Sequence, residues 1–193
     1  MKPEEVLESI EKVAAQRRLP IIGPKRGRFL DEVIEGHRPK TILEVGTLVG
    51  YSAIRMGRHL EKGGHITCVE LRDDMALIAR SNFAKAGLSD RIEVVVGDAL
   101  KVLPALKGSF DMVFFDAVKE DYITYLKSVE GLLHRGSVVV ADNVRSHAEE
   151  VAKYLDYVRN SGRYRSEYRE SAENYMYGSG ETFAEAVEVS VKL

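Results

Sequence analysis

Two segments of the sequence end in polar residues that could bind a hard metal ion. Asp116 follows the apolar run Phe110–Phe115, and Asp142 and Asn143 follow the run Ser137–Ala141. If these runs are neighbouring parallel strands, their carboxyl ends bring the polar side chains to one spot above the sheet. Oxygen ligands without a nearby His or Cys pair favour Mg²⁺, or Ca²⁺ or Mn²⁺, and argue against zinc. One such residue would more simply cap a helix, but together they predict a metal site.

Lys119 stands three residues after Asp116 and could act as a base beside that metal. Taken alone it would be an ordinary surface lysine. A bound dication disfavours the charged ammonium group, and a neutral amine can remove the proton from a metal-bound hydroxyl. Mg²⁺ prefers six oxygens, which leaves room for water and for substrate oxygens. The resulting oxyanion could act as a nucleophile.

A turn with two glycines, Glu44–Ser52, could bind a small ligand at the carboxyl end of a strand. Gly46 allows the backbone to turn sharply, and Gly50 allows a ligand to approach closely. The turn lacks the G-x-G-x-x-G pattern of dinucleotide-binding proteins, because Leu48 stands where the second glycine would be. A carboxylate at Glu44 would oppose a pyrophosphate but suits a cationic sulfonium ligand with an ammonium group.

Two further acidic residues complete a predicted nucleoside site. Glu70 ends the run His65–Glu70, where a carboxylate can accept hydrogen bonds from both ribose hydroxyls. Asp98 follows the run Arg91–Val96, where an adenine edge would be read. A simpler interpretation is a tight turn with a strand-end glutamate, but the Glu44 carboxylate beneath the turn favours the cofactor.

The elements that must position these residues alternate along the chain. Strands are predicted at Thr41–Val45, His65–Glu70, Arg91–Val96, Phe110–Phe115 and Ser137–Ala141, with helices at Ser52–Leu60, Asp73–Ala86, Leu100–Leu106, Asp121–Leu133 and His147–Ser161. Two amphipathic helices, Pro3–Arg17 and Pro24–Glu35, come first, and Tyr164–Tyr168 with Thr182–Lys192 suggests a terminal antiparallel hairpin. This alternation predicts an α/β fold with helices on both faces of a parallel sheet. We expect one domain over residues 1–193, with residues 1–38 as a helical cap.

The composition limits the classes of function. The chain has 193 residues and a net charge of -2, which gives no overall attraction to nucleic acid or to anionic membranes. The N-terminus is charged, and no apolar run approaches the ~18 residues of a membrane span. Cys68, the single cysteine, lies in a predicted strand and fits a buried structural thiol in a reducing compartment. We therefore predict a cytoplasmic protein without a membrane partner.

Several motifs occur in a fixed order along nearly the whole chain. They are E-x-G-x-x-x-G-Y-S at Glu44–Ser52, the strand-end Glu70, Gly97-Asp98-Ala99, F-x-D-x-x-K-x-x-Y at Phe114–Tyr122, and Asp142-Asn143. This combination, together with Gly23–Arg28, resembles the cation-dependent O-methyltransferases of the catechol and caffeoyl-CoA types. The resemblance implies a Rossmann-like class I methyltransferase fold, with a seven-stranded, mostly parallel sheet whose last strand is antiparallel.

The resemblance also implies roles for particular residues. Asp116, Asp142 and Asn143 would bind Mg²⁺, and Lys119 would be the base. The methyl donor, S-adenosylmethionine, would lie among Glu44, Gly46, Ser52, Glu70, Ala99 and Asp116.

The acceptor is less sharply defined. The catechol enzymes line their ring site with tryptophan and methionine, whereas this chain has no tryptophan and carries Val118 before the base and Pro20 on the N-terminal wall. A carboxylate that grips the second hydroxyl in catechol enzymes aligns with Glu173, and Glu170 is a rival. We predict Mg²⁺-dependent methylation of a small catechol-like acceptor whose identity stays open.

Two alternatives remain at this point. Tyr164, Tyr168, Tyr175 and Tyr177 interleave with Arg159, Arg163, Arg165 and Arg169, so aromatic stacking and phosphate contacts could hold a hydroxylated tRNA base. The simpler interpretation is that these residues form the two faces of an exposed hairpin. A non-catalytic cofactor-binding module would also keep the fold, although it would not be expected to retain Lys119 and the metal ligands. The N-terminal helices could cover the acceptor site or form a homodimer face.

Overall fold

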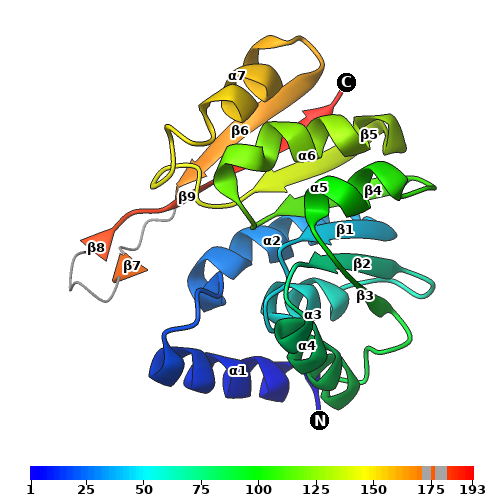
Figure 1. The fold of residues 1–193 in the computed structure, drawn as a ribbon, viewed down its shortest axis with the longest axis vertical. Coiled ribbons are helices and arrows are strands. Elements are labelled where there is room, and N and C mark those ends of the chain that lie inside the picture. The colour runs from blue at the N-terminus through cyan, green and yellow to red at the C-terminus, as the bar shows by residue number, and fades with distance from the viewer. Residues whose placement is uncertain (171–174, 177–181) are drawn as a thin grey trace.

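A seven-stranded sheet forms the centre of the protein, and its order places the carboxyl ends of three strands side by side (Figure 1). The computed structural model describes residues 1–170, 175–176 and 182–193. The sheet order is β3-β2-β1-β4-β5-β9-β6, with bounds β1 Thr41–Val45, β2 His65–Glu70, β3 Ile92–Val96, β4 Phe110–Phe115, β5 Leu133–Ala141, β6 Tyr164–Glu170 and β9 Ala186–Lys192. Parallel pairing joins β3 through β5, and β9 is antiparallel to both neighbours. The expected mostly parallel sheet with an antiparallel last strand is confirmed.

Helices cover both faces of this sheet. They are α1 Pro3–Arg17, α2 Gly23–His37, α3 Tyr51–Gly57, α4 Asp73–Lys85, α5 Ala99–Val102, α6 Tyr122–Val129 and α7 Ala152–Asn160, with short 3-10 turns at Leu103–Ala105, Lys119–Asp121 and Glu130–Leu132. Both predicted N-terminal helices are present. The strands β7 (Tyr175–Met176) and β8 (Thr182–Phe183) pair in a small separate sheet.

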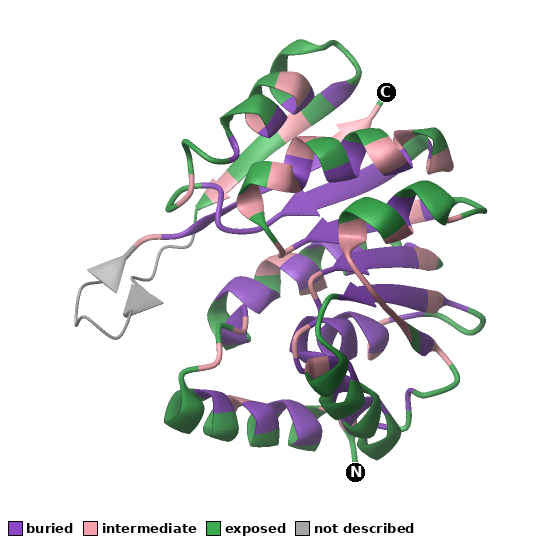
Figure 2. Ribbon diagram, viewed as in Figure 1, coloured by how far each residue is buried: buried purple, intermediate pink, exposed green. Residues whose placement is uncertain are grey.

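The central strands of the sheet are buried (Figure 2). Alternate residues of each strand pack into two different cores, one on each face of the sheet. In β4, Met112 and Phe114 face the core that α1 to α4 cover. Val113 and Phe115 face the core that includes residues of α6 and α7. Cys68 is buried in β2 as predicted. Among the described residues, no helix combines the length and apolar character needed to cross a membrane.

The strand β5 begins earlier than the sequence predicts, at Leu133 instead of Ser137. Leu133 pairs with Phe110, and the register then shifts before the regular ladder begins. Residues 134–136 at this irregularity are exposed and polar or glycine, so the apolar signal appears only at Ser137. The predicted helix Asp121–Leu133 is consequently too long, because α6 ends at Val129 and a 3-10 turn leads into the strand.

Three further boundaries differ from the predictions. The helix predicted at Leu100–Leu106 ends at Val102, where a 3-10 turn with Pro104 follows, because proline lacks the N–H that a helix interior needs. The helix predicted at His147–Ser161 covers only α7, since residues 144–151 form turns. The strand predicted at Thr182–Lys192 is divided into β8 and β9, with Ala184 and Glu185 between them.

Candidate active site

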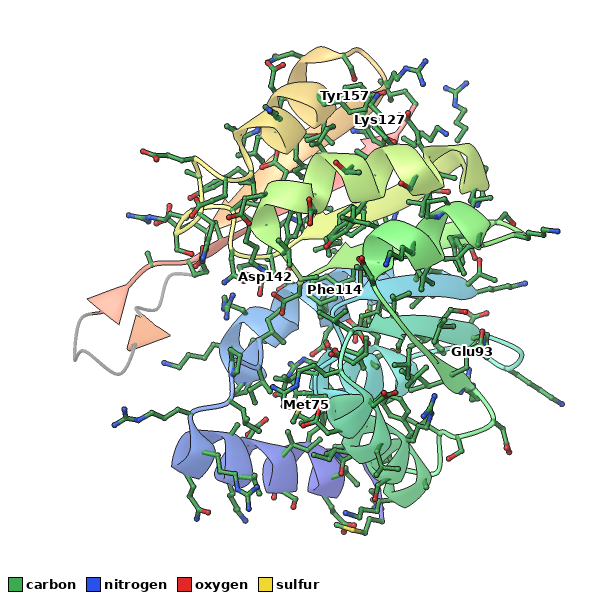
Figure 3. The ribbon with its side chains drawn as sticks, in the orientation of Figure 1. Met75, Glu93, Phe114, Lys127, Asp142 and Tyr157 are labelled. Atoms are coloured by element: carbon green, nitrogen blue, oxygen red, sulfur yellow. The ribbon has the colours of Figure 1, made fainter. Side chains whose placement is uncertain are left out.

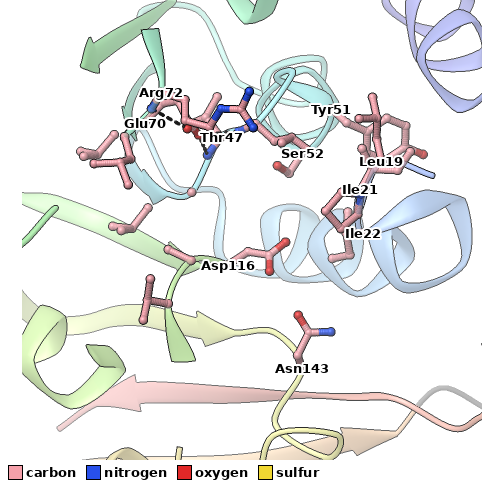
Figure 4. A pocket seen from close by; sticks show the side chains of 18 of the residues that line it. Leu19, Ile21, Ile22, Thr47, Tyr51, Ser52, Glu70, Arg72, Asp116 and Asn143 are labelled. Atoms are coloured by element: carbon pink, nitrogen blue, oxygen red, sulfur yellow. Dashed lines mark hydrogen bonds between the residues drawn. The ribbon is translucent and has the colours of Figure 1, made fainter. Parts of the chain in front are cut away.

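A cavity of about 850 Å³ opens at the carboxyl edge of the sheet (Figure 4). Its walls come from the turn after β1 and from the ends of β2 to β5. The segment from Ala14 to Pro24, which joins α1 to α2, closes another side. Most of the predicted site residues line this cavity, namely Gly46, Ser52, Glu70, Asp98, Ala99, Asp116, Lys119 and Asn143. Glu44 and Asp142 are fully buried and lie outside this lining. Gly50, also predicted to contact the cofactor, does not line the cavity either.

The turn after β1 has the tight backbone that its glycines predict. Gly46 has a φ of +92°, and a Cβ atom there would collide with the backbone carbonyl of Asp116. Gly50 has a φ of +84° and packs against the ring of Phe83, where a side chain would also collide. Glycine is therefore required at both positions because the backbone is left-handed and its surroundings are closed.

Glu44 is buried beneath this turn and anchors it. Its carboxylate accepts hydrogen bonds from the Ser52 hydroxyl at 2.5 Å and from the Thr47 hydroxyl at 2.9 Å. Burial raises the pKa of Glu44 to about 7, against the opposing effect of these hydrogen bonds. The side chains that shift this pKa besides burial are those of Ser52, Cys68, Thr47 and Asp116, none of which is basic. A cationic ligand above the turn would therefore favour the ionised form of Glu44.

Glu70 lies on the cavity wall at the end of β2, where the sequence predicts a ribose-binding carboxylate. One oxygen accepts hydrogen bonds from the backbone N–H groups of Thr47 at 3.1 Å and Leu48 at 2.7 Å. The other accepts from the backbone N–H of Arg72 at 3.0 Å (Figure 4). Glu70 thus fixes the glycine turn relative to β2. Asp98 lines the cavity with Ala99 and also caps α5, since its carboxylate accepts from the Leu100 N–H.

The candidate metal ligands come directly after the strands β4 and β5 in the sequence, as predicted. The Asp116 N–H donates to the carbonyl of Val45 at 2.9 Å, and the Asp142 N–H donates to the carbonyl of Phe115 at 3.0 Å. These bonds extend the parallel pairing one residue beyond the strands. The side chains of Asp116 and Asn143 consequently face the same space in the cavity (Figure 4).

Asp142 lies deeper than Asp116, at the carboxyl edge of the sheet (Figure 3). Both of its oxygens accept hydrogen bonds from Nη1 of Arg26 on α2, at 2.7 and 2.6 Å. Burial raises the pKa of Asp142 to about 6, while Arg26 lowers it and Asp116 raises it. The sequence did not predict this pairing of the N-terminal helical cap with a candidate metal ligand.

The donor set fits a hard divalent cation. Two carboxylates and one amide supply only oxygen ligands, and the amide oxygen of Asn143 faces Asp116. Within the described part of the chain, no group of three or more His, Cys, Asp or Glu residues has metal-binding geometry, so the fit depends on the Asn143 amide. Asp116 and Asn143 face the cavity and could hold the cation. Asp142 could join them if the cation takes over one of the two oxygens that now accept from Arg26.

Lys119 is held against these ligands and is largely buried. Its side chain is 12% exposed, and Nζ lies 2.8 Å from both the Asp116 carboxylate and the Tyr122 hydroxyl. That hydroxyl is 3.0 Å from the carbonyl oxygen of Phe115, to which it can donate while it accepts from Lys119. Lys119 is therefore not the surface residue that its type alone suggests.

Two residues that contact the candidate site, Tyr122 and Arg26, were not identified from the sequence. Tyr122 lies in the quoted F-x-D-x-x-K-x-x-Y motif, so its spacing from Lys119 could have indicated a contact. Arg26 lies in the quoted Gly23–Arg28 segment, but nothing there indicates a partner 116 positions away. Of the two rival carboxylates for the acceptor, Glu170 forms an ion pair with Arg145. Glu173 lies outside the described residues.

Comparisons with known proteins agree with this geometry. The sequence pattern of a family described as O-methyltransferase matches residues 1–161. The chain is 36% identical to catechol O-methyltransferase B of Danio rerio over 90% of its own length and 68% of that protein. Its structure is similar to an O-methyltransferase from Bacillus cereus in complex with SAH, with a TM-score of 0.83, 29% identity and coverage of 97% and 91% of the two chains. It is also similar to the O-methyltransferase TomG of Streptomyces achromogenes in complex with SAM, with a TM-score of 0.83, 26% identity and coverage of 97% and 89%.

Replacement of Gly46 by alanine should distort the turn after β1. Because the new Cβ would collide with the Asp116 carbonyl at a left-handed φ, we expect Gly46→Ala to lower the free energy of unfolding by about 1–3 kcal/mol. S-adenosylhomocysteine should also bind at least ~10-fold more weakly, since 1.4 kcal/mol of lost contact is tenfold. Urea unfolding and calorimetry measure both. Gly36→Ala in α2, where nothing lies within 4 Å, is the matched control and should not weaken either property. If Gly46→Ala binds S-adenosylhomocysteine as tightly as the wild type, the turn is not part of the donor site.

The buried carboxylate of Glu44 should make stability depend on pH. Its folded-state pKa is raised from 4.5 to about 7, so its favourable contribution is complete below pH 4.5 and is lost as pH rises through about 7. We expect the stability of the wild type relative to Glu44→Gln to fall by roughly 2.5 kcal/mol between pH 5 and pH 8. Urea unfolding of both ligand-free proteins at the two pH values measures this difference, with Glu8→Gln as an exposed control. A difference that does not change with pH would contradict a raised pKa.

Proposed function

Because this chain belongs to the O-methyltransferase family and is an S-adenosylmethionine-dependent enzyme, we propose that it methylates one hydroxyl of a small catechol-like acceptor. The proposed reaction requires Mg²⁺ or a related divalent cation and uses Lys119 as the base. The observation that carries this proposal is the shared cavity. It brings Asp116, Asn143 and Lys119 beside the turn Glu44–Ser52, within reach of one bound donor and one acceptor.

The donor is proposed to bind along the carboxyl ends of β1 to β3. Glu70 would accept hydrogen bonds from the ribose hydroxyls, and Asp98 and Ala99 would lie beside the adenine. Gly46, Gly50 and Ser52 shape the turn under the methionine part. Glu44 beneath them contributes a carboxylate that favours a ligand bearing positive charge.

The acceptor is proposed to lie between the donor and the N-terminal helical cap. Leu19, Ile21 and Ile22 form apolar walls there, which suit the faces of an aromatic ring. On the opposite side, Asp116, Asp142 and Asn143 would hold the cation, which when bound supplies positive charge that favours the ionised form of an acceptor hydroxyl. A vicinal diol presents two oxygens to such a site.

Lys119 is proposed to take the proton of the acceptor hydroxyl. Asp116 and Tyr122 orient Nζ, so the amine is fixed at the edge of the cavity before the acceptor arrives. The acceptor oxygen then attacks the methyl carbon, and the new O–C bond forms as the S–C bond breaks. The products are the methyl ether, S-adenosylhomocysteine and a proton held on Lys119.

The contacts of the C-terminal Tyr and Arg residues favour a small acceptor over tRNA. The Tyr164 hydroxyl is bonded to Glu130, and Arg159 forms a double hydrogen bond with Glu188. Both groups are thus engaged within the protein. Among the tyrosines of this set whose side chains are described, Tyr168 alone is exposed, and a single aromatic ring offers little surface for stacking. The side chain of Tyr175 and all of Tyr177 lie outside the described residues.

Removal of the metal or of the base should abolish methyl transfer. We expect EDTA to stop transfer of labelled methyl from the donor to catechol, and added Mg²⁺ to restore it. Lys119→Ala should lower kcat at least ~100-fold, because general base catalysis contributes about that factor or more. S-adenosylhomocysteine should bind this variant normally, since Lys119 faces the acceptor.

The control for this experiment is Lys101→Ala, which removes an exposed lysine of α5 outside the cavity and should leave kcat unchanged. Transfer that survives chelation would contradict the metal, and transfer that survives Lys119→Ala would contradict the base. A wild-type enzyme that methylates monophenols as fast as vicinal diols would contradict the acceptor assignment.

A further inference from the structure

We propose that Glu185 is a positioning residue for the metal site: its carboxylate orients the side-chain amide of Asn143 so that the carbonyl oxygen faces the cation. This inference rests on the proposed function, because it concerns the metal ligand Asn143. Glu185 lies between β8 and β9, 42 positions after Asn143, and it does not line the cavity.

The Glu185 side chain is buried and saturated with donors. It is 3% exposed, and one oxygen accepts hydrogen bonds from the backbone N–H groups of Arg145 at 3.2 Å, Ser146 at 3.2 Å and Ala186 at 2.9 Å. Its other oxygen accepts from Nδ2 of Asn143 at 3.3 Å. The carboxylate therefore joins the start of β9 to the loop that follows β5.

The backbone around Asn143 is also held in place. Asn143 has a left-handed φ of +62°, which asparagine tolerates better than most residues. The next residue, Val144, donates its N–H to the carbonyl of Ala186 at 3.1 Å. The backbone thus fixes where the Asn143 side chain projects, but it does not determine which end of the amide turns toward the cavity.

The chemistry of Glu185 settles that orientation. The two ends of an amide have nearly the same shape, but one only donates hydrogen bonds and the other only accepts. An ionised carboxylate only accepts, so it pairs with the NH₂ end and leaves the oxygen of Asn143 directed toward Asp116 (Figure 4). The reversed amide would set two oxygens against each other and present N–H groups to a cation. Partners that orient a metal ligand in this way commonly change metal affinity 10–100-fold when they are removed.

Glu185→Gln separates this role from simple support of the loop. Glutamine has almost the same shape, and its own oxygen can still accept from the backbone of Arg145, Ser146 and Ala186. Its NH₂ group, however, would face Asn143 and favour the reversed amide. Asn143→Asp added to this variant should repair the site, because an aspartate has oxygen at both ends and cannot be reversed.

The test measures binding of Mn²⁺ by electron paramagnetic resonance, alongside S-adenosylhomocysteine affinity without metal and thermal unfolding. We expect Glu185→Gln to weaken Mn²⁺ binding at least ~10-fold. Its affinity for S-adenosylhomocysteine should stay within about twofold of that of the wild type, because Glu185 does not line the cavity. The double variant with Asn143→Asp should regain most of the Mn²⁺ affinity. Glu167→Gln on the exposed side of β6 is the control and should change none of these values.

Unchanged Mn²⁺ affinity in Glu185→Gln, or no recovery in the double variant, would overturn the inference. If the wild type binds Mn²⁺ no better than Asp116→Asn, the proposed metal site itself fails, which is a distinct result. If Glu185→Gln does not fold, an NMR measurement on the wild type tests the inference instead. Mg²⁺ should shift the side-chain carbonyl ¹³C resonance of Asn143 while its NH₂ protons stay protected, and fast exchange of these protons would contradict the role of Glu185.

Discussion

The parallel pairing of β4 with β1 on one side and β5 on the other is the constraint on which the site depends. The last residues of the three strands, Val45, Phe115 and Ala141, lie side by side in the sheet. The three strands therefore end at the same edge. The next residues are the candidate site residues: Gly46 forms the turn proposed to lie under the donor, and Asp116 and Asp142 bring carboxylates to the edge of the sheet. Because β strands alternate their faces, a shift of one residue in either pairing would turn these side chains away from one another.

This arrangement concentrates negative charge in a buried place. Burial raises the pKa of Glu44 to about 7 and that of Asp142 to about 6. Ionising either carboxyl group therefore costs free energy unless a cation lies nearby. Arg26 and Lys119 supply part of the compensating charge, from α2 and from the turn after β4. The sulfonium donor and the divalent cation proposed for this cavity would supply more. The same electrostatic feature therefore accounts for both proposed ligands, and Arg26 ties the helical cap to it.

The sequence allowed the main features of the fold and most of the cavity to be predicted, because both depend on local patterns. Apolar runs that alternate with helical segments indicate the strands, and the topology places the residue after each strand, which is why Asp116 and Asp142 could be predicted to lie together. The start of β5 was missed because residues 134–136 are exposed and polar or glycine, which hides the strand. The partners of Asp142 and Asn143 were missed for another reason. Arg26 and Glu185 reach them across long sequence separations, and no spacing rule relates such pairs.

The most direct test of the account is the position of the cation relative to the three strand-end ligands. Crystals grown with Mn²⁺, S-adenosylhomocysteine and a catechol that carries a nitro group would give an anomalous signal from the metal much stronger than that from the sulfur atoms. We expect one strong anomalous peak within ~2.5 Å of oxygens from Asp116, Asp142 and Asn143, a bonding distance for hard cations with oxygen ligands. Both catechol oxygens should lie within bonding distance of this metal peak, and the amine of Lys119 should lie beside one of them. A peak elsewhere, or an ordered catechol in the cavity without metal between it and Asp116, would contradict the account.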